Sequence, residues 1–146
     1  AMNERCRHSR FASHAPAPSS DMWYVADTRR YGRGIFAARN ISAGTVFATC
    51  PYFVDFEGTL SGRFIDFAWD QEGLSVMVLG CGSLFNHSDR PNADWRFATG
   101  SFSVEEDQSR QFLHFFTKTD IRKDQEITIS YGDEYWECPS RRGTKA

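Results

Sequence analysis

Asn86, His87 and Tyr131 are the residues of this 146-residue chain whose types and surroundings offer the most chemistry. The Asn86 amide carries two N–H donors and a carbonyl acceptor, so it can fix a ligand amine or a crossing backbone. His87 can serve as a buried structural residue, a metal ligand or a general base. Tyr131 follows an apolar run, where a tyrosine ordinarily packs its ring and leaves the hydroxyl at the rim. Each residue alone therefore fits a structural role as well as a functional one.

A glycine-containing loop, Tyr31-Gly32-Arg33-Gly34, is a fourth candidate. Two glycines around Arg33 let the backbone approach a ligand closely, because no Cβ stands in the way. A strand pattern follows the loop where a dinucleotide-binding motif would have a helix, so such a motif is excluded. On these four residues alone, a plain β-turn explains the loop equally well.

The four cysteines are scattered at Cys6, Cys50, Cys81 and Cys138, with no C-x-x-C pair. This spacing predicts neither a metal site nor a disulfide framework, but reduced thiols in an intracellular protein, nuclear or cytoplasmic. Cys81 with His87 would make a thiol nucleophile, but the sequence places no third orienting group beside them.

Composition narrows the class of protein. The chain is 40% hydrophobic with 13 Phe, which predicts one domain with a real core. A net charge of -2 and the lack of a basic patch make nucleic acid an unexpected direct partner. No apolar run approaches the length of a membrane span, so no membrane partner is expected.

The local patterns predict short strands and little helix. We expect a flexible N-terminal tail over 1–20, a folded domain over 21–137 and a C-terminal tail over 138–146. A short helix is expected around Gly82–Phe85, and Arg63–Trp69 fits either strand or helix. The predicted strands, rich in aromatic and β-branched residues, are Trp23–Ala26, Gly34–Ala38, Thr45–Thr49, Tyr52–Phe56, Ala93–Phe97, Gln111–Phe116 and Ile127–Tyr131.

One spacing occurs twice and suggests two similar β units. Each copy reads as strand, apolar anchor, tight turn and strand, and the turn position needs a residue that tolerates positive φ. The two copies are Phe36, Ile41, Gly44 and Phe47, and Phe116, Ile121, Asp124 and Ile127.

Three stretches together resemble the signature motifs of the SET-domain protein-lysine methyltransferases. They are Tyr31–Ala37, Leu84–Asn92 with its Asn-His-Ser and Pro-Asn, and Glu126–Trp136 with its Tyr-Gly. The resemblance covers about Trp23 to Trp136. It implies a mostly β fold, the SET-domain β-clip of several small sheets, with a C-terminal segment threaded through the loop after Asn86.

The resemblance also implies roles for individual residues. The implied reaction is methyl transfer from S-adenosyl-L-methionine to a lysine side chain of a protein, leaving S-adenosyl-L-homocysteine. Tyr131 would be the catalytic residue at the methyl group, and Ile129 would line the lysine channel. The residues implied in cofactor binding are Tyr31, Gly32, Arg33, Gly34, Asn86, His87, Tyr135 and Trp136.

The chain departs from the family pattern at several positions. Asp89 stands where the family often has Cys, Ser83 where it often has Arg, and Ser130 where it usually has Asp. Ile129 lacks the hydroxyl and bulk of the aromatic residue that limits methyl number in relatives, which predicts di- or trimethylation.

The family's cysteine-rich segment after the last motif is missing, since only Cys138 follows. The Tyr135-Trp136 region, the N-terminal segment or a second subunit, as in a homodimer, must then complete the lysine channel. The implied partner is a protein or peptide bearing a target lysine, either a histone tail or a non-histone protein. A catalytically silent β-clip that binds or scaffolds is the alternative.

Overall fold

The strands of the chain form two small sheets. The computed structural model describes residues 20–104 and 111–137. One sheet has the strand order β1 (Trp23–Thr28), β2 (Gly32–Ala37), β9 (Glu126–Ile129) and β6 (Asn86–His87). The other has the order β4 (Trp69–Gln71), β5 (Leu74–Val78), β3 (Val46–Asp55), β8 (Phe112–Thr117) and β7 (Ala93–Phe97). The predicted mostly β architecture is confirmed.

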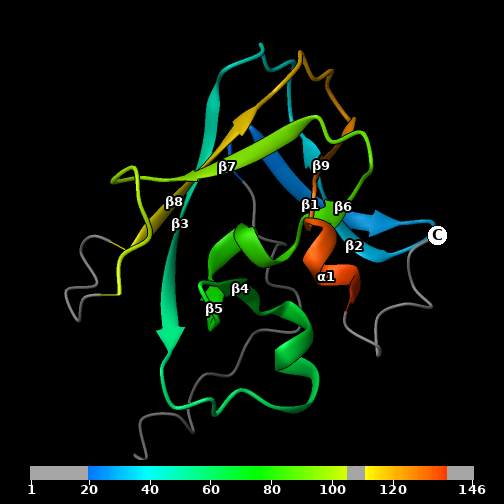
Figure 1. Cartoon of the computed structure of the whole chain (residues 1–146). Helices are drawn as coiled ribbons and strands as arrows, with labels where there is room; N and C mark the ends of the chain where they lie inside the picture. The colour runs from blue at the N-terminus through cyan, green and yellow to red at the C-terminus, as the bar shows by residue number, and fades with distance from the viewer. Residues whose placement is uncertain (1–19, 105–110, 138–146) are drawn as a thin grey trace, which may run out of the picture.

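Helical structure in the described residues is short. The 3₁₀ helices η2 (Gly62–Phe67) and η3 (Gly80–Ser83) flank β4 and β5, and the α-helix α1 (Asp133–Glu137) ends the described chain. In Figure 1, α1 lies beside β6. The helix expected at Gly82–Phe85 begins two residues earlier. The ambiguous segment Arg63–Trp69 is mostly helical, with its last residue beginning β4.

Alternation of buried and half-buried residues explains why the strands form. Along β8, Leu113, Phe115 and Thr117 are buried, while the residues between them are half-buried. Phe115 is fully buried and contacts Phe85 and Trp69, so β8 is the centre of the core. A strand with this period of two packs one face on the core.

The prediction of two strands at Thr45–Thr49 and Tyr52–Phe56 was wrong, because β3 runs unbroken through Pro51. Pro51 lacks an N–H donor, but it lies where β3 changes partner. Pro51 pairs with Phe112 of β8, and Tyr52 pairs with Val78 of β5. The Pro51 carbonyl still accepts a hydrogen bond from the Leu79 N–H. Proline at a change of partner therefore does not end the strand.

The repeated spacing corresponds to a reciprocal contact between two β units. Ile41 and Ile121 form a two-way backbone bridge. The Gly44 N–H donates to the Thr117 carbonyl, and the Asp124 N–H donates to the Ala37 carbonyl. Both turn residues have positive φ, 79° at Gly44 and 64° at Asp124, as the sequence predicts.

The segment that follows η3 holds β9 in place. β6 pairs in parallel with β9, matching Asn86 to Thr128 and His87 to Ile129. Farther along, the Asn92 side chain donates to the Glu126 carbonyl at 2.8 Å and accepts from the Thr128 N–H at 2.9 Å. β9 thus lies between β2 and the segment 86–92, and carries its C-terminal end to the site described next. In the described residues, no helix has the length and apolar character needed to cross a membrane.

Candidate active site

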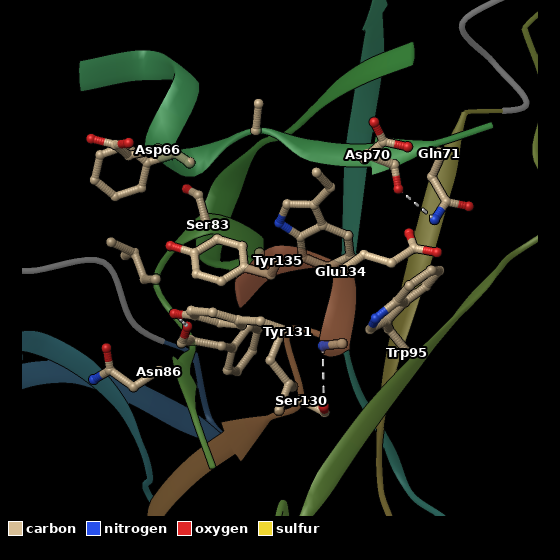
Figure 2. A pocket seen from close by; sticks show the side chains of 18 of the residues that line it. Asp66, Asp70, Gln71, Ser83, Asn86, Trp95, Ser130, Tyr131, Glu134 and Tyr135 are labelled. Carbon is tan, nitrogen blue, oxygen red and sulfur yellow. Dashed lines mark hydrogen bonds between the residues drawn. The ribbon is translucent and has the colours of Figure 1, made fainter. Parts of the chain in front are cut away.

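A cleft of about 1320 Å³ opens where β6, the end of β9, α1 and the segment from η2 to β4 meet. Figure 2 shows the rings of Tyr131 and Tyr135 in this cleft, with Asn86 and Ser83 on one side and Trp95 and Gln71 on the other. Tyr31 from the loop after β1 and Arg33 from the start of β2 also line the cleft. The cleft therefore unites residues from all three sequence motifs.

Tyr131 is fixed at both its backbone and its hydroxyl. The hydroxyl donates to the Phe85 carbonyl at 2.6 Å, and the backbone N–H donates to His87 Nδ1 at 3.1 Å. Burial, then the nearby Tyr135 and Glu126, raise the pKa of Tyr131 to about 12. The hydroxyl is consequently neutral at physiological pH, so it offers an oxygen lone pair to the cleft and does not act as a phenolate base.

His87 orients Tyr131 from behind. Its Nδ1 accepts the Tyr131 N–H and so carries no proton, which places the ring proton on Nε2. Nε2 lies 3.0 Å from Asp89 Oδ1 and donates to it. Asp89, one of the departures from the family pattern, thereby fixes the tautomer. His87 does not line the cleft, so its predicted direct contact with a cofactor remains a prediction.

Asn86 lines the cleft and joins two motifs. Its Nδ2 donates to the Arg33 carbonyl at 3.1 Å and to Glu126 Oε1 at 2.8 Å. The amide therefore ties the start of β2 to the first residue of β9. Glu126 was not among the sequence candidates, because nothing in its local pattern indicates a partner 40 residues away.

Gly32 and Gly34 are each required for a different structural reason. Gly32 has a φ of 76° with open space around it, which is a backbone requirement. Gly34 is buried, and a Cβ there would lie 2.7 Å from Glu126 Oε1 and 2.9 Å from Asn86 Nδ2. Gly34 thus permits close packing below Asn86. Neither glycine lines the cleft, whereas Tyr31 and Arg33 do.

Of the two aromatic residues of α1, Tyr135 lines the cleft, and Trp136 packs against residues beside it. The Tyr135 ring lines the cleft, 4.7 Å from the Tyr131 ring between centroids. Trp136 does not line it, but packs against the rings of Tyr131 at 6.2 Å and His87 at 5.0 Å. Ile129 is 2% exposed and lines the cleft, while its role in a lysine channel remains a prediction.

An aromatic wall completes the cleft and was missed from the sequence. Trp69 and Trp95 both line it, with ring centroids 5.1 Å apart. Trp95 lies in a correctly predicted strand, but its partner Trp69 lay in the segment of uncertain type. Their separation in sequence hid the contact.

The charge of the cleft is mostly negative. Among the described residues that line it, Arg33 is the one basic residue. Arg33 Nε lies 3.9 Å from Asp27 Oδ1, and both side chains are exposed, so this ion pair is weak. The acidic residues that line the cleft are Asp66, Asp70, Asp133, Glu134 and Glu137.

The sequence also raised the alternatives of a thiol nucleophile at Cys81 with His87 and of a metal site. Cys81 hydrogen-bonds with Cys50 while His87 pairs with Asp89 and Tyr131, so Cys81 and His87 form no nucleophile–base pair. Within 20–104 and 111–137, no three His, Cys, Asp or Glu residues gather to hold a metal ion. Cys6, Cys138 and most of both predicted tails lie outside the described residues.

Comparison with known proteins agrees with this geometry. A family model described as the SET domain matches residues 32–132. The chain is 32% identical over 119 residues to the histone-lysine N-methyltransferase, H3 lysine-37 specific, of Schizosaccharomyces pombe, covering 77% of this chain and 74% of that protein. It also resembles the crystal structure of a Plasmodium falciparum protein assigned as a histone methyltransferase. That match has a TM-score of 0.62 and 26% identity, and covers 81% of this chain and 99% of the other.

Proposed function

Because the chain belongs to the SET domain family and is a protein-lysine N-methyltransferase, we propose that its cleft binds S-adenosylmethionine and transfers the methyl group to a lysine. The observation that carries this proposal is the placement of Tyr131. Its hydroxyl is held by the Phe85 carbonyl, its backbone by His87, and its ring faces a cleft shared with Asn86 and Arg33.

The residues present suit this cofactor. S-adenosylmethionine supplies an electrophilic methyl group on a positively charged sulfur. Carboxylates line much of the cleft and favour a cation, while Arg33 can pair with the carboxylate of the amino-acid part. The ring of Tyr135 lines the cleft and is a flat aromatic group of the kind on which an adenine can stack. Tyr31, Arg33 and Asn86 are the residues that would hold the cofactor at the other end.

The lysine must arrive without its proton. A free lysine has a pKa of about 10.4, so at neutral pH it is mostly an ammonium. The rings of Trp69 and Trp95 and the side chain of Ile129 form an apolar wall that disfavours the charged form and lowers this pKa. Alignment of the amine then contributes most of the rate, and the Tyr131 hydroxyl oxygen stabilises positive charge in the transition state.

We propose a basic protein segment such as a histone tail as the substrate. The carboxylates at the rim of the cleft, among them Asp66, Asp70 and Glu134, attract lysine- and arginine-rich peptides and repel acidic ones. The similar protein of fission yeast is named for activity on histone H3, which supports the same class. A histone substrate would place the enzyme in the nucleus, and a non-histone substrate would allow the cytoplasm.

We propose di- or trimethylation as the outcome. Ile129 has no hydroxyl with which to hold the amine, and it leaves more room than Tyr or Phe. Tyr52 cannot supply a hydroxyl, because it is buried elsewhere with its oxygen bonded to Ser103. Tyr135 does lie in the cleft and is the remaining candidate. Mass spectrometry of product peptides at long reaction times, for the wild type and Tyr135→Phe, measures both effects. Accumulation of monomethyl-lysine alone in both proteins contradicts the proposal.

Calorimetric titration with S-adenosylmethionine and S-adenosylhomocysteine tests cofactor use and separates an enzyme from a silent β-clip. We expect binding of both by the wild type, and weaker binding by Asn86→Ala, which loses the link between the start of β2 and β9. A folded wild-type protein with no affinity for either compound would instead favour a scaffolding role.

A further inference from the structure

Two cysteines that are 31 residues apart in sequence meet inside the fold. Cys50 Sγ of β3 and Cys81 Sγ of η3 lie 3.5 Å apart, and both thiols are free. Their exposed fractions are 2% and 5%. Local sequence spacing gave no sign of the pair. Neither residue belongs to the cleft, so methyl transfer does not explain their contact.

The surroundings of the pair favour reaction with a small molecule. A separate cavity of about 420 Å³ is lined by both cysteines together with Trp23, Phe47 and Leu84. The hydrogen bond between the two thiols lowers the pKa of Cys50 and raises that of Cys81. Cys50 is therefore the first of the two to become a thiolate, the form that reacts with oxidants.

We propose that Cys50 and Cys81 form a peroxide-sensitive switch that closes to an intramolecular disulfide and displaces η3. The Cys50 thiolate attacks a peroxide oxygen, the O–O bond breaks, and the departing hydroxide takes a proton to become water. The Cys81 sulfur then attacks the sulfenic acid sulfur as its thiol proton leaves. The S–S bond forms, the S–O bond breaks, and the released hydroxide takes that proton to become a second water. The two sulfurs lose two electrons and the peroxide gains them.

The movement falls on η3 because β3 is more firmly held. Closing the pair shortens the sulfur separation from 3.5 Å to about 2.05 Å. At Cys50, β3 is paired with Leu113 of β8. η3 is held by single 3₁₀ hydrogen bonds, of which Gly82 N–H to the Leu79 carbonyl is 3.3 Å long.

A shift of η3 reaches the cleft by a short route. The Cys81 carbonyl accepts the Leu84 N–H at 3.0 Å, and the next residue, Phe85, supplies the carbonyl that holds the Tyr131 hydroxyl. Gly80 precedes Cys81 with a φ of 64°, a conformation that adapts at low cost in glycine. Oxidation at Cys81 therefore displaces the Phe85 carbonyl, which accepts the hydrogen bond from the Tyr131 hydroxyl. Formation of the disulfide is independent of the proposed reaction, whereas its effect on turnover rests on that reaction.

The experiment uses the full chain with Cys6→Ser and Cys138→Ser, so that only the pair remains. After treatment with hydrogen peroxide and alkylation, trypsin yields the peptides 40–63 with Cys50 and 64–96 with Cys81, since Arg90 precedes a proline. We expect the two peptides to be linked, and dithiothreitol to separate them. Recovery of both cysteines alkylated after peroxide overturns the switch, whatever the protein catalyses.

Methyl transfer before and after peroxide measures the coupling, with Cys81→Ala in the same background as the control. Because a misplacement of about 1 Å at a catalytic group can cost up to 100-fold, we expect oxidation to lower kcat about 10-fold and dithiothreitol to restore it. The Cys81→Ala variant should keep its turnover and not respond to peroxide. Full activity of the linked protein, or equal loss in Cys81→Ala, refutes the coupling while leaving the proposed function standing.

Discussion

Asp89 reaches Tyr131 through a hydrogen bond to His87, and it does not line the cleft, so its role can be tested without changing a cleft residue. Asp89→Ala removes the acceptor of His87 Nε2–H and frees the ring to place its proton on Nδ1, opposite the Tyr131 N–H. We expect kcat to fall about 10-fold with KM little changed, the size typical of a lost supporting hydrogen bond in a site. Steady-state kinetics measures this.

Asp89→Asn is the matched control, because its amide oxygen still accepts the Nε2–H. It should keep most of the activity and the wild-type His87 tautomer in ¹H–¹⁵N spectra of the imidazole. If Asp89→Ala and Asp89→Asn lose the same activity while both retain the Nε2–H tautomer, the positioning role of Asp89 is wrong.

At the scale of elements, Asn92 holds β9 through two backbone hydrogen bonds in a largely buried position. Asn92→Ala leaves the Glu126 carbonyl and the Thr128 N–H without this partner, at a cost of about 1–3 kcal/mol each. We expect a clear loss of unfolding free energy in urea, together with loss of activity, because β9 carries Tyr131. Asn92→Asp keeps the acceptor for Thr128 and should lose less. Equal stability of all three proteins contradicts the role of Asn92.

The first residues of β2 give a second prediction at this scale. A Cβ at Gly34 would overlap Asn86 and Glu126, so Gly34→Ala should destabilise the fold by about 1–3 kcal/mol and weaken cofactor binding. Gly32→Ala is the control, since its Cβ meets open space and only the positive φ is strained. Thermal unfolding measures the loss of stability, and calorimetric titration measures the loss of cofactor affinity. Weaker cofactor binding by Gly32→Ala than by Gly34→Ala would show that these residues act through their backbone alone.

Strands whose own sequence shows a clear local pattern were predictable from the sequence. Contacts between residues far apart in the chain were not. Ala93–Phe97 was predicted at the observed bounds because the aromatic residues Trp95 and Phe97 alternate with the polar residues Asp94 and Arg96. β5 was missed, since the apolar run before Gly80 shows no such alternation. The contact of Cys50 with Cys81 and that of Trp69 with Trp95 come from tertiary packing, which no local pattern encodes. Tyr131 and Asn86 were found through the family resemblance, while Glu126 and Asp89 became visible only through their hydrogen bonds.

At the scale of the whole molecule, the partly buried Tyr131 hydroxyl links stability to pH. Its pKa is raised from 10.0 to about 12, so the folded chain keeps a proton that the unfolded chain releases above pH about 10. The contribution of Tyr131 to the free energy of unfolding is fully present below pH about 10 and is lost as the pH rises to about 12. We expect the free energy of unfolding to fall by up to about 2 kcal/mol across this window.

Tyr131→Phe isolates this contribution, because its ring packs the same way and has no proton to lose. Tyr24, whose pKa is raised by its hydrogen bond to Asp124, titrates in both proteins and cancels in the comparison. Urea unfolding at several pH values should show the wild type losing its advantage over Tyr131→Phe as the solution becomes alkaline. Parallel pH curves would mean that the Tyr131 hydroxyl is not buried in solution.

The whole account rests on the cleft transferring a methyl group to a lysine under the control of Tyr131. The direct measurement is transfer of tritiated methyl from S-adenosylmethionine to purified histones and to cell extract, by the wild type and Tyr131→Phe at equal cofactor saturation. The account predicts that the wild type labels lysine in a histone, and that Tyr131→Phe binds the cofactor but transfers about 100-fold more slowly, as expected when one stabilising group is lost. Transfer at the wild-type rate by Tyr131→Phe, or no lysine labelling by a wild type that binds the cofactor, would contradict it.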